Sequence, residues 1–373
     1  MSIGPSSLHP LGGRFKDRAS ARLLAALLAA LIALSSLSAA LAQGETPASA
    51  RLNGIRHVYQ DWNNCGPANL TMALSYFGWS YGQQRAASFL KPAIEDKNVS
   101  PAEMVAFVNA PQNELPDVRA FWRFGGTIDL LKRLIAAGFP VVVESGYDVE
   151  DLGWMGHYET VVAYDDNTQT IWVYDSYLGI GSGYGRTYSY DEFDNWWRHF
   201  NRTFLVFFPL ERTEELRALL GPYEDVSWAA NTALNKALQE AAADQSDGWA
   251  WFNAGVSAAK LGNYYDAASY FDLAFAQGLP FRVTWYHFAP YEAYYNVGRY
   301  QDVIDLANNT EATTLYVEET YYWRGMAYAA QGLTGDAQTQ FELALDYNRN
   351  FTAAADALAR VEAGQAVMPS MAH

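Results

Sequence analysis

Two adjacent stretches decide the fold, QDWNNCGPA at residues 60–68 and NLTMALSYF at residues 69–77. The apolar side chains of the second stretch recur at the spacing of one helical face, at Leu70, Ala73, Leu74 and Phe77. A helix is therefore expected over residues 69–77, directly after the Gly-Pro pair of the first stretch. Cys65 then lies on a loop at the N-terminus of this helix, where free N–H groups and the helix dipole favour a thiolate.

Cys65 is the single cysteine among the 373 residues, so the chain cannot form an intramolecular disulfide. A lone cysteine can be an inert, small apolar residue of a core. The place of Cys65 before a helix, followed by a glycine that would let a substrate approach closely, instead favours a nucleophile. Cys65 is therefore a candidate catalytic residue, with the inert core residue as the alternative.

A nucleophilic cysteine needs a base, and His157 has the most suitable position. It opens a predicted strand over residues 158–164, which a turn connects to a return strand over residues 170–174. Asp175 ends the return strand, so it can lie beside His157 and fix the tautomer of the imidazole. The alternative for His157 is an ordinary histidine of a strand, with its hydrogen bonds satisfied. The alternative for Asp175 is a turn carboxylate with no catalytic role.

Gln60 lies five residues before Cys65 and can place an amide N–H near a developing oxyanion, with the backbone N–H of Cys65 as its partner. It could also be a plain loop residue. The other histidines are weaker candidates for the base: His57 is expected to flank the site, His199 to pack among tryptophans, and His287 to lie in a separate helical region.

The chain resembles the bacteriocin-processing, double-glycine leader peptidase family, whose members are papain-like cysteine peptidases. The residues that carry the resemblance are Gln60, Asn64-Cys65-Gly66-Pro67-Ala68, Met72 and Tyr76-Phe77-Gly78, followed by Gly156-His157-Tyr158, Val161-Val162, Ala163-Tyr164-Asp165 and Asp175-Ser176-Tyr177. The resemblance covers about residues 52–210. Ser176 stands where the family usually has proline.

The resemblance implies that Cys65 is the nucleophile, His157 the base, Asp175 the residue that orients the base, and Gln60 part of the oxyanion hole. The best-known members of the family are fused to transporters and face the cytoplasm, whereas this chain has an export signal. The double-glycine leader substrate is therefore not carried over to this chain.

The order of elements over residues 51–212 predicts an α+β domain. Helices are expected first, at residues 100–109, where Ser100-Pro101-Ala102-Glu103 has the form of a capping box, and at residues 127–137, closed by Gly138. Strands follow, at residues 140–144, 158–164, 170–174 and 203–208. Helices followed by a largely antiparallel sheet are typical of the α+β class.

The acidic segment Tyr147–Asp151 lacks the spacing of a calcium loop and is expected to be a solvated loop, so no metal and no cofactor are expected.

An internal repeat follows from about residue 213. Gly262, Gly298 and Gly332 recur at intervals of 36 and 34 residues, each in a turn between helical patterns. This spacing resembles the tetratricopeptide repeat, with a terminal capping helix over residues 351–362. The second unit matches poorly because Pro290 stands where a helix is expected. Plain helical hairpins are the alternative, and in either case the expected role is contact with a partner or with the catalytic domain.

The N-terminus has the form of a secretory signal. A polar, basic segment precedes an apolar run at residues 23–42, which ends in Ala-Leu-Ala. An uncleaved membrane anchor is the alternative, since 20 apolar residues can just span a bilayer. Both predict that the rest of the chain lies outside the cytoplasm.

The formal charge of -16 argues against nucleic acid as a partner.

The predicted organisation has five parts: a signal peptide or anchor at 1–42, a linker at 43–50, a papain-like peptidase domain at 51–212, a tetratricopeptide-like domain at 213–365, and a tail at 366–373. The predicted function is that of an exported cysteine peptidase, which hydrolyses peptide, isopeptide or amide bonds of a peptide or protein substrate through a thioester. The alternative is a catalytically silent, protease-like binding protein at the cell envelope. The helical repeats are expected to contact a protein partner.

Overall fold

The computed structural model describes Met1 and residues 46–110 and 115–369. The predicted leader at residues 1–42 lies outside this part, so the structure does not test it. The described residues include no helix that combines the length and the apolar character needed to cross a membrane. Residues Ala48–His373 form one compact unit, and the description below concerns that unit.

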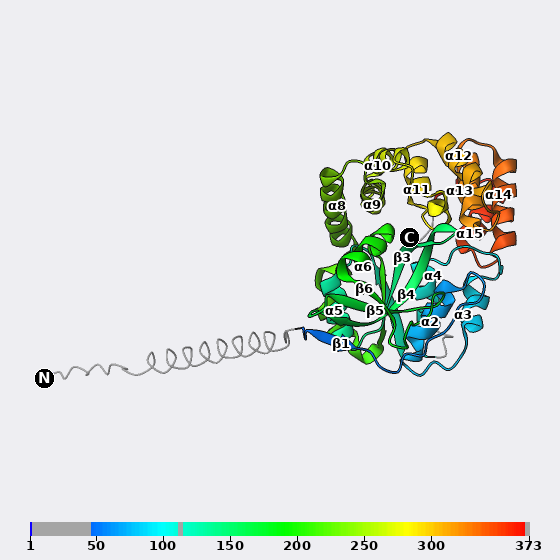
Figure 1. The fold of residues 1–373 in the computed structure, drawn as a ribbon. Coiled ribbons are helices and arrows are strands. Elements are labelled where there is room, and N and C mark those ends of the chain that lie inside the picture. Colours follow the sequence, from blue (N-terminus) through cyan, green and yellow to red (C-terminus); the bar gives the residue numbers. More distant parts are fainter. Residues whose placement is uncertain (2–45, 111–114, 370–373) are drawn as a thin grey trace. The chain divides into compact units, whose positions relative to one another are not determined.

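An antiparallel sheet lies at the centre of the first half of this unit (Figure 1). Its strands in the described residues are β1 (Ser49–Arg51), β2 (Val118–Arg123), β3 (Val141–Val149), β4 (Gly153–Asp165), β5 (Thr170–Asp175), β6 (Arg186–Ser189) and β7 (Phe204–Pro209). They are ordered β2-β7-β3-β4-β5-β6, and β1 pairs with the end of β4. Every pairing of neighbours is antiparallel.

Helices cover both faces of the sheet because successive side chains of a strand point to opposite faces. On β3, Val142 packs in a cluster with helices α2 (Cys65–Ser75), α3 (Gln83–Leu90) and α4 (Pro101–Asn109). Its neighbours Val141 and Val143 pack on the other face, with α5 (Ile128–Ala136), α6 (Tyr190–Trp197) and α7 (Thr213–Leu220). Both faces of the central strands are therefore buried.

The predicted helix signals act as expected at α4 and α5. The hydroxyl of Ser100 accepts from the backbone N–H of Glu103, and the Glu103 side chain accepts from the backbone N–H of Ser100. Thr127 caps α5 by accepting from the backbone N–H of Leu130 at 3.1 Å. Gly138, just past the end of α5, has φ +81°, a backbone conformation that favours glycine.

Three local predictions were wrong. Helix α2 begins at Cys65 rather than at residue 69, because the Cys-Gly-Pro segment itself forms the first turn. Residues 147–149, expected in a solvated loop, continue β3, which pairs with β4 as far as Val149 opposite Gly153. Residues 49–50, expected in a linker, belong to β1, where Ser49 and Ala50 pair with the end of β4. Strands β2 and β6 were not predicted.

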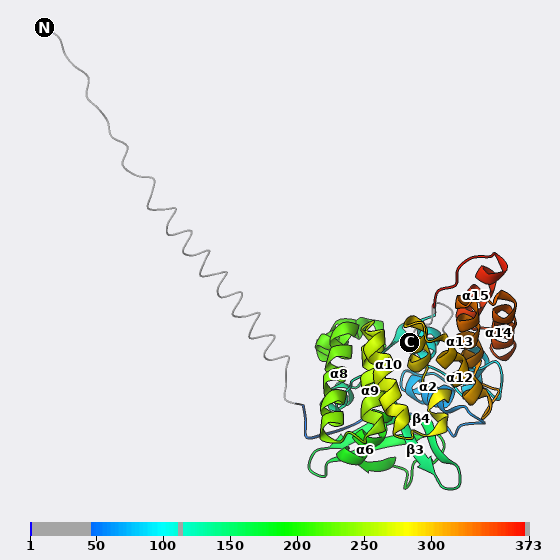
Figure 2. The same ribbon diagram turned by 90° about the horizontal axis from the view of Figure 1, so that it is seen from above.

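The second half of the unit is all-helical and follows the sheet in the chain. Its elements are η2 (Leu210–Arg212), α7, η3 (Gly221–Glu224), α8 (Val226–Ala243), α9 (Gly248–Lys260), α10 (Tyr264–Ala276), η4 (Phe281–Trp285), α11 (Ala289–Asn296), α12 (Tyr300–Glu311), α13 (Glu318–Ala330), α14 (Thr334–Tyr347) and α15 (Thr352–Glu362). The apolar residues of α7 pack in the core of the sheet, although the helical domain was predicted to begin at residue 213. Figure 2 shows α8 to α15 as successive helices beside the sheet domain.

The helical units repeat in their packing as well as in sequence. A Cβ on Gly255 would lie 2.6 Å from the Phe271 ring, and a Cβ on Gly325 would lie 2.7 Å from the Phe341 ring. Both pairs are separated by 16 residues and bring the two helices of a hairpin into close contact. The turn glycines 262, 298 and 332 have φ values of +75°, +76° and +77°. Pro290 lies in the first turn of α11, where proline is tolerated. The predicted fold class, an α+β domain followed by helical repeats, is confirmed.

Candidate active site

Cys65 occupies the first position of α2, and Asn64 precedes it as the N-cap residue. The residue that follows must be small, because a Cβ on Gly66 would lie 3.2 Å from Val99 Cβ. Burial alone would raise the pKa of the Cys65 thiol. The hydrogen bond and charge of His157, with the backbone N–H groups of Tyr158 and Gly66, outweigh burial and lower this pKa below 9.0.

His157 lies on β4 with 3% of its surface exposed. Its Nε2 is 2.9 Å from Oδ1 of Asp175, which leaves Nδ1 to interact with Cys65. Burial favours the neutral imidazole, but the charge and hydrogen bond of Asp175, aided by Cys65, raise the pKa of His157 to about 10. With a lowered thiol pKa and a raised imidazole pKa, the two groups favour a thiolate–imidazolium pair.

Asp175 is the last residue of β5 and is 1% exposed. Its Oδ1 also accepts the backbone N–H groups of Tyr177 at 2.7 Å and Leu178 at 2.9 Å. Burial would raise the pKa of Asp175, but His157 and these N–H donors lower it below its ordinary value. Because Asp175 pairs with Glu159 across the β4–β5 hairpin, it lies one diagonal step from His157.

Gln60 forms two hydrogen bonds with Ser176, the residue that follows Asp175. Its backbone N–H donates to the carbonyl oxygen of Ser176 at 2.8 Å, and its side-chain Oε1 accepts from the Ser176 hydroxyl at 2.8 Å. The amide oxygen is thus occupied, which leaves the amide N–H groups for the cleft. Ser176, the departure from the family pattern, here supplies the hydroxyl that positions Gln60.

The four predicted residues meet at or beside one cleft of about 260 Å³. Cys65, His157 and Gln60 line it, and Asp175 lies behind His157. The rest of the lining comprises Asp61, Trp62, Asn63, Lys97, Tyr147, Leu152, Met155, Gly156, Tyr177 and Tyr286. Most of the lining is thus aromatic or apolar, and it includes one residue of the helical half.

Asn69 is a site residue that the sequence analysis missed. It is fully buried on α2, and its Nδ2 donates to the carbonyl oxygens of Cys65 at 3.0 Å and Tyr158 at 2.7 Å. The same group is 3.1 Å from the Ser176 hydroxyl, and Oδ1 accepts from Thr160 at 2.8 Å. Asn69 therefore joins the helix that carries Cys65 to the strand that carries His157 and to the residue after Asp175. The available signal was a polar residue one helical turn after Cys65, next to the apolar stripe.

Glu159 is a second missed residue, buried two positions after His157. Its carboxylate accepts from Ser145 at 3.0 Å and from Tyr188 at 3.1 Å. Burial and the charge of Asp175 raise its pKa to about 7, against the opposing effect of His157. Glu159 thus adds a second ionisable carboxyl behind the triad.

The remaining histidines do not act as the base in this arrangement. His57 interacts through Nε2 with the backbone carbonyl oxygen of Asp175 at 2.8 Å, so it flanks the site as expected. His199 accepts from Trp154 at 3.0 Å and stacks on a tryptophan, and burial lowers its pKa to about 3. Burial likewise lowers the pKa of His287 to about 3. The described residues contain no group of three or more His, Cys, Asp or Glu side chains suited to a metal ion.

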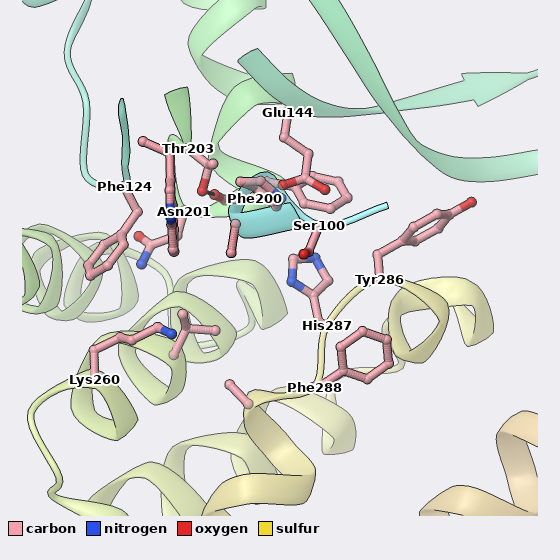
Figure 3. A pocket seen from close by; sticks show the side chains of 15 residues that line it. Ser100, Phe124, Glu144, Phe200, Asn201, Thr203, Lys260, Tyr286, His287 and Phe288 are labelled. Carbon is pink, nitrogen blue, oxygen red and sulfur yellow. Dashed lines mark hydrogen bonds between the residues drawn. The ribbon is translucent and has the colours of Figure 1, made fainter. Parts of the chain in front are cut away.

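A smaller cavity of about 110 Å³ lies between the sheet and the helical half. Figure 3 shows Glu144 approaching it from the sheet, opposite Tyr286, His287 and Phe288 on a single helical-half segment. Burial raises the pKa of Glu144 well above its ordinary value, although the interaction with the Tyr158 hydroxyl opposes this rise. This cavity adjoins the cleft that Cys65 and His157 line, since Tyr286 lines both.

Comparison with known proteins supports a peptidase-like first half. The model of the Peptidase_C39 like family matches residues 51–204. A solved structure, the MamA RS-1 ArsTM double mutant, matches 36% of this chain and 75% of its own length, with 17% identity and a TM-score of 0.33, which is too low to support an argument. No curated protein matches the chain. The family match covers the segment that carries Cys65, His157 and Asp175.

Proposed function

We propose that this protein is a cysteine peptidase that uses Cys65, His157 and Asp175 as its catalytic triad. The observation that carries the proposal is the chain of contacts from the half-buried Cys65 thiol, through the buried His157 ring, to the buried Asp175 carboxylate. A structural histidine would not need a carboxylate on one nitrogen and the only cysteine of the chain on the other. The family match over residues 51–204 supports the same reading.

The proposed reaction begins with attack of the Cys65 thiolate on the carbonyl carbon of a peptide bond. The amide N–H of Gln60 and the backbone N–H of Cys65 bind the oxyanion. His157 then gives its Nδ1 proton to the departing amine as the C–N bond breaks, which leaves a thioester. In the second half, neutral His157 takes a proton from water, the hydroxide adds to the thioester, and the carboxylic acid leaves as the thiolate returns. Asp175 holds the imidazole orientation throughout.

The reactivity of the thiol tests the proposal. We expect iodoacetamide to alkylate Cys65 rapidly near pH 6, well below the pKa of about 8.5 for an ordinary cysteine. His157→Ala should abolish this low-pH reactivity. His57→Gln is the matched control, because His57 interacts with the backbone carbonyl oxygen of Asp175 rather than with its carboxylate, so its replacement should leave the pH profile unchanged. An ordinary thiol profile in the unaltered protein would contradict a catalytic role and would favour the silent binding protein.

The N-terminal segment leads to a separate proposal about location. We propose that residues 23–42 direct export of the chain, because a basic segment precedes this apolar run and a small-residue cleavage pattern ends it. N-terminal sequencing of the protein recovered outside the cytoplasm tests this. A start near Gln43 is expected for a signal peptide, whereas an intact leader in the membrane fraction would indicate an anchor.

A further inference from the structure

Tyr286 belongs to the helical half of the chain but lines the catalytic cleft with Cys65 and His157. It lies between η4 and α11, more than 120 residues after His157 in the sequence. Figure 3 shows its ring on the segment that also carries His287 and Phe288. The cleft is therefore built from both halves, and the peptidase-like segment alone would lack this part of its wall.

Close packing fixes the position of Tyr286. A Cβ on Gly156 would lie 3.0 Å from its ring, and the ring centroid is 5.9 Å from that of Trp154. The nearby guanidinium of Arg282 donates to the carbonyl oxygens of Leu152 at 2.5 Å and Trp154 at 3.4 Å. These contacts hold η4 against the turn that connects β3 to β4. Tyr286 is thus held in the cleft wall by contacts of its segment with β4 and with the turn before β4.

The contacts also show on which side of the cleft Tyr286 lies. Tyr286 lines the cleft with Leu152, Met155 and His157, which come from β4 and the turn before it, so Tyr286 lies at the part of the cleft that carries the imidazole. In the proposed reaction His157 protonates the departing amine, so the part of the substrate that follows the scissile bond must lie on this side. The Tyr286 hydroxyl oxygen faces the backbone N–H of Gly156, and the half-buried side chain forms part of the cleft lining. Leu152 and Met155, from the same turn and strand, add apolar surface.

We propose that Tyr286 is a specificity-determining residue, through which the helical half forms an apolar subsite for the residues that follow the scissile bond. The subsite suits an aliphatic or aromatic side chain, because Tyr286, Leu152 and Met155 line it with an aromatic ring and two uncharged, largely apolar side chains. The assignment of the subsite to the leaving-group side rests on the proposed function. The presence of Tyr286 in the cleft wall beside Cys65 does not depend on that function.

Labelling of Cys65 by two maleimides tests the wall without any substrate. N-Methylmaleimide and N-(1-pyrenyl)maleimide share one electrophile but differ in bulk, so the ratio of their rates is insensitive to the fraction of thiolate. Tyr286→Ala should raise the pyrenyl-to-methyl ratio about tenfold, in line with the effect of a changed apolar contact in a pocket. Tyr286→Phe should keep the ratio of the unaltered protein. Tyr265→Ala, which alters a 78% exposed tyrosine on α10, is the control. If Tyr286→Ala does not fold, Tyr286→Leu replaces it, and an unchanged ratio in the folded variant would overturn the proposal.

A peptide library then tests which side of the scissile bond the wall contacts. A mixture of peptides from a protein digest is incubated with the full-length protein and its variants, and the new termini are read by mass spectrometry. Tyr286→Ala should weaken the preference for aliphatic and aromatic residues after the cleaved bond and leave the preference before it unchanged. A change confined to the residues before the bond would overturn the subsite assignment. If no variant cleaves any peptide, the peptidase proposal and the subsite both fail, while the maleimide ratio still decides whether the wall exists.

Discussion

Replacing Cys65 with serine should change how the stability of the protein depends on pH. In the folded protein the pKa of the Cys65 thiol lies below its ordinary value, and that of His157 is raised from 6.5 to about 10. At pH values above the folded pKa of Cys65, the folded pair holds one proton, on His157. Where this range lies above pH 6.5 and below about pH 8.5, the unfolded pair also holds one proton, on the thiol. Because the two counts are equal, the pair adds no pH dependence to the free energy of unfolding in this range.

Serine does not titrate in this range, so this balance is lost in Cys65→Ser. The pKa of His157 remains raised in the variant, because Asp175 supplies the largest raising effects. Above pH 6.5 the folded variant then keeps a proton that the unfolded chain has released, and stability falls as the pH rises. The fall is about 1.4 kcal/mol per pH unit, so up to about 3 kcal/mol would be lost between pH 6.5 and about 8.5 relative to the unaltered protein. Loss of the thiolate itself makes this an upper limit.

Urea denaturation at a series of pH values between 6 and 9 measures this difference. Glu159, whose pKa is about 7, is present in both proteins, so its direct contribution largely cancels in the difference curve. Adding Asp175→Asn to Cys65→Ser should remove the decline, because the carboxylate that holds the proton on His157 is gone. Parallel curves for Cys65→Ser and the unaltered protein would refute the thiolate–imidazolium pair.

Three further substitutions test individual parts of the site. Asn69→Leu should lower the free energy of unfolding by about 3 kcal/mol, because it leaves several buried hydrogen-bonding groups without their Asn69 partner. An unchanged urea midpoint would contradict this role of Asn69. Gln60→Ala should reduce kcat about 100-fold without changing the rate of thiol alkylation, and an equal loss of alkylation would show that Gln60 acts on the thiol instead. Gly156→Ala should destabilise the protein by about 2 kcal/mol, because its Cβ would lie 2.6 Å from Phe200. Gly335→Ala, in an open part of α14, is its control and should be neutral or stabilising in thermal unfolding.

The positions of the four candidate residues on their own elements could be predicted because these placements depend mostly on local sequence. Cys65 precedes a clear helical stripe, so its place at a helix N-terminus follows from sequence. His157 and Asp175 belong to one hairpin with a short turn, which fixes their register within a few residues. Gln60 follows from its short distance along the chain to Cys65. Each of these placements needs only neighbouring elements, whereas the meeting of Cys65 with His157, more than 90 residues later, was supported by the family resemblance.

The features that were missed depend on distant parts of the chain. Strand β2 pairs with β7, more than 80 residues later, and its own sequence VRAFWR has no regular alternation that would mark it as a strand. Asn69 is polar at a position that would otherwise suit a solvent-exposed face, and only the fold shows that two strands surround it. Tyr286 lies in a region where tyrosines are frequent, and no local pattern separates a cleft wall from a repeat-packing residue.

The helical half also shapes how the protein can be studied. Trp154, on the strand that carries His157, and Phe200 are buried in the same cluster as the core of the helical repeats. Arg198 forms two hydrogen bonds with Asp247 at the start of α9, at 2.6 and 3.1 Å. A chain shortened before α9 would expose both aromatic rings and leave Arg198 without this partner, at a cost of several kcal/mol. Loss of activity in such a chain would therefore report damage to the strand that holds His157. Point substitutions such as Tyr286→Ala can separate a role in substrate binding from a role in folding.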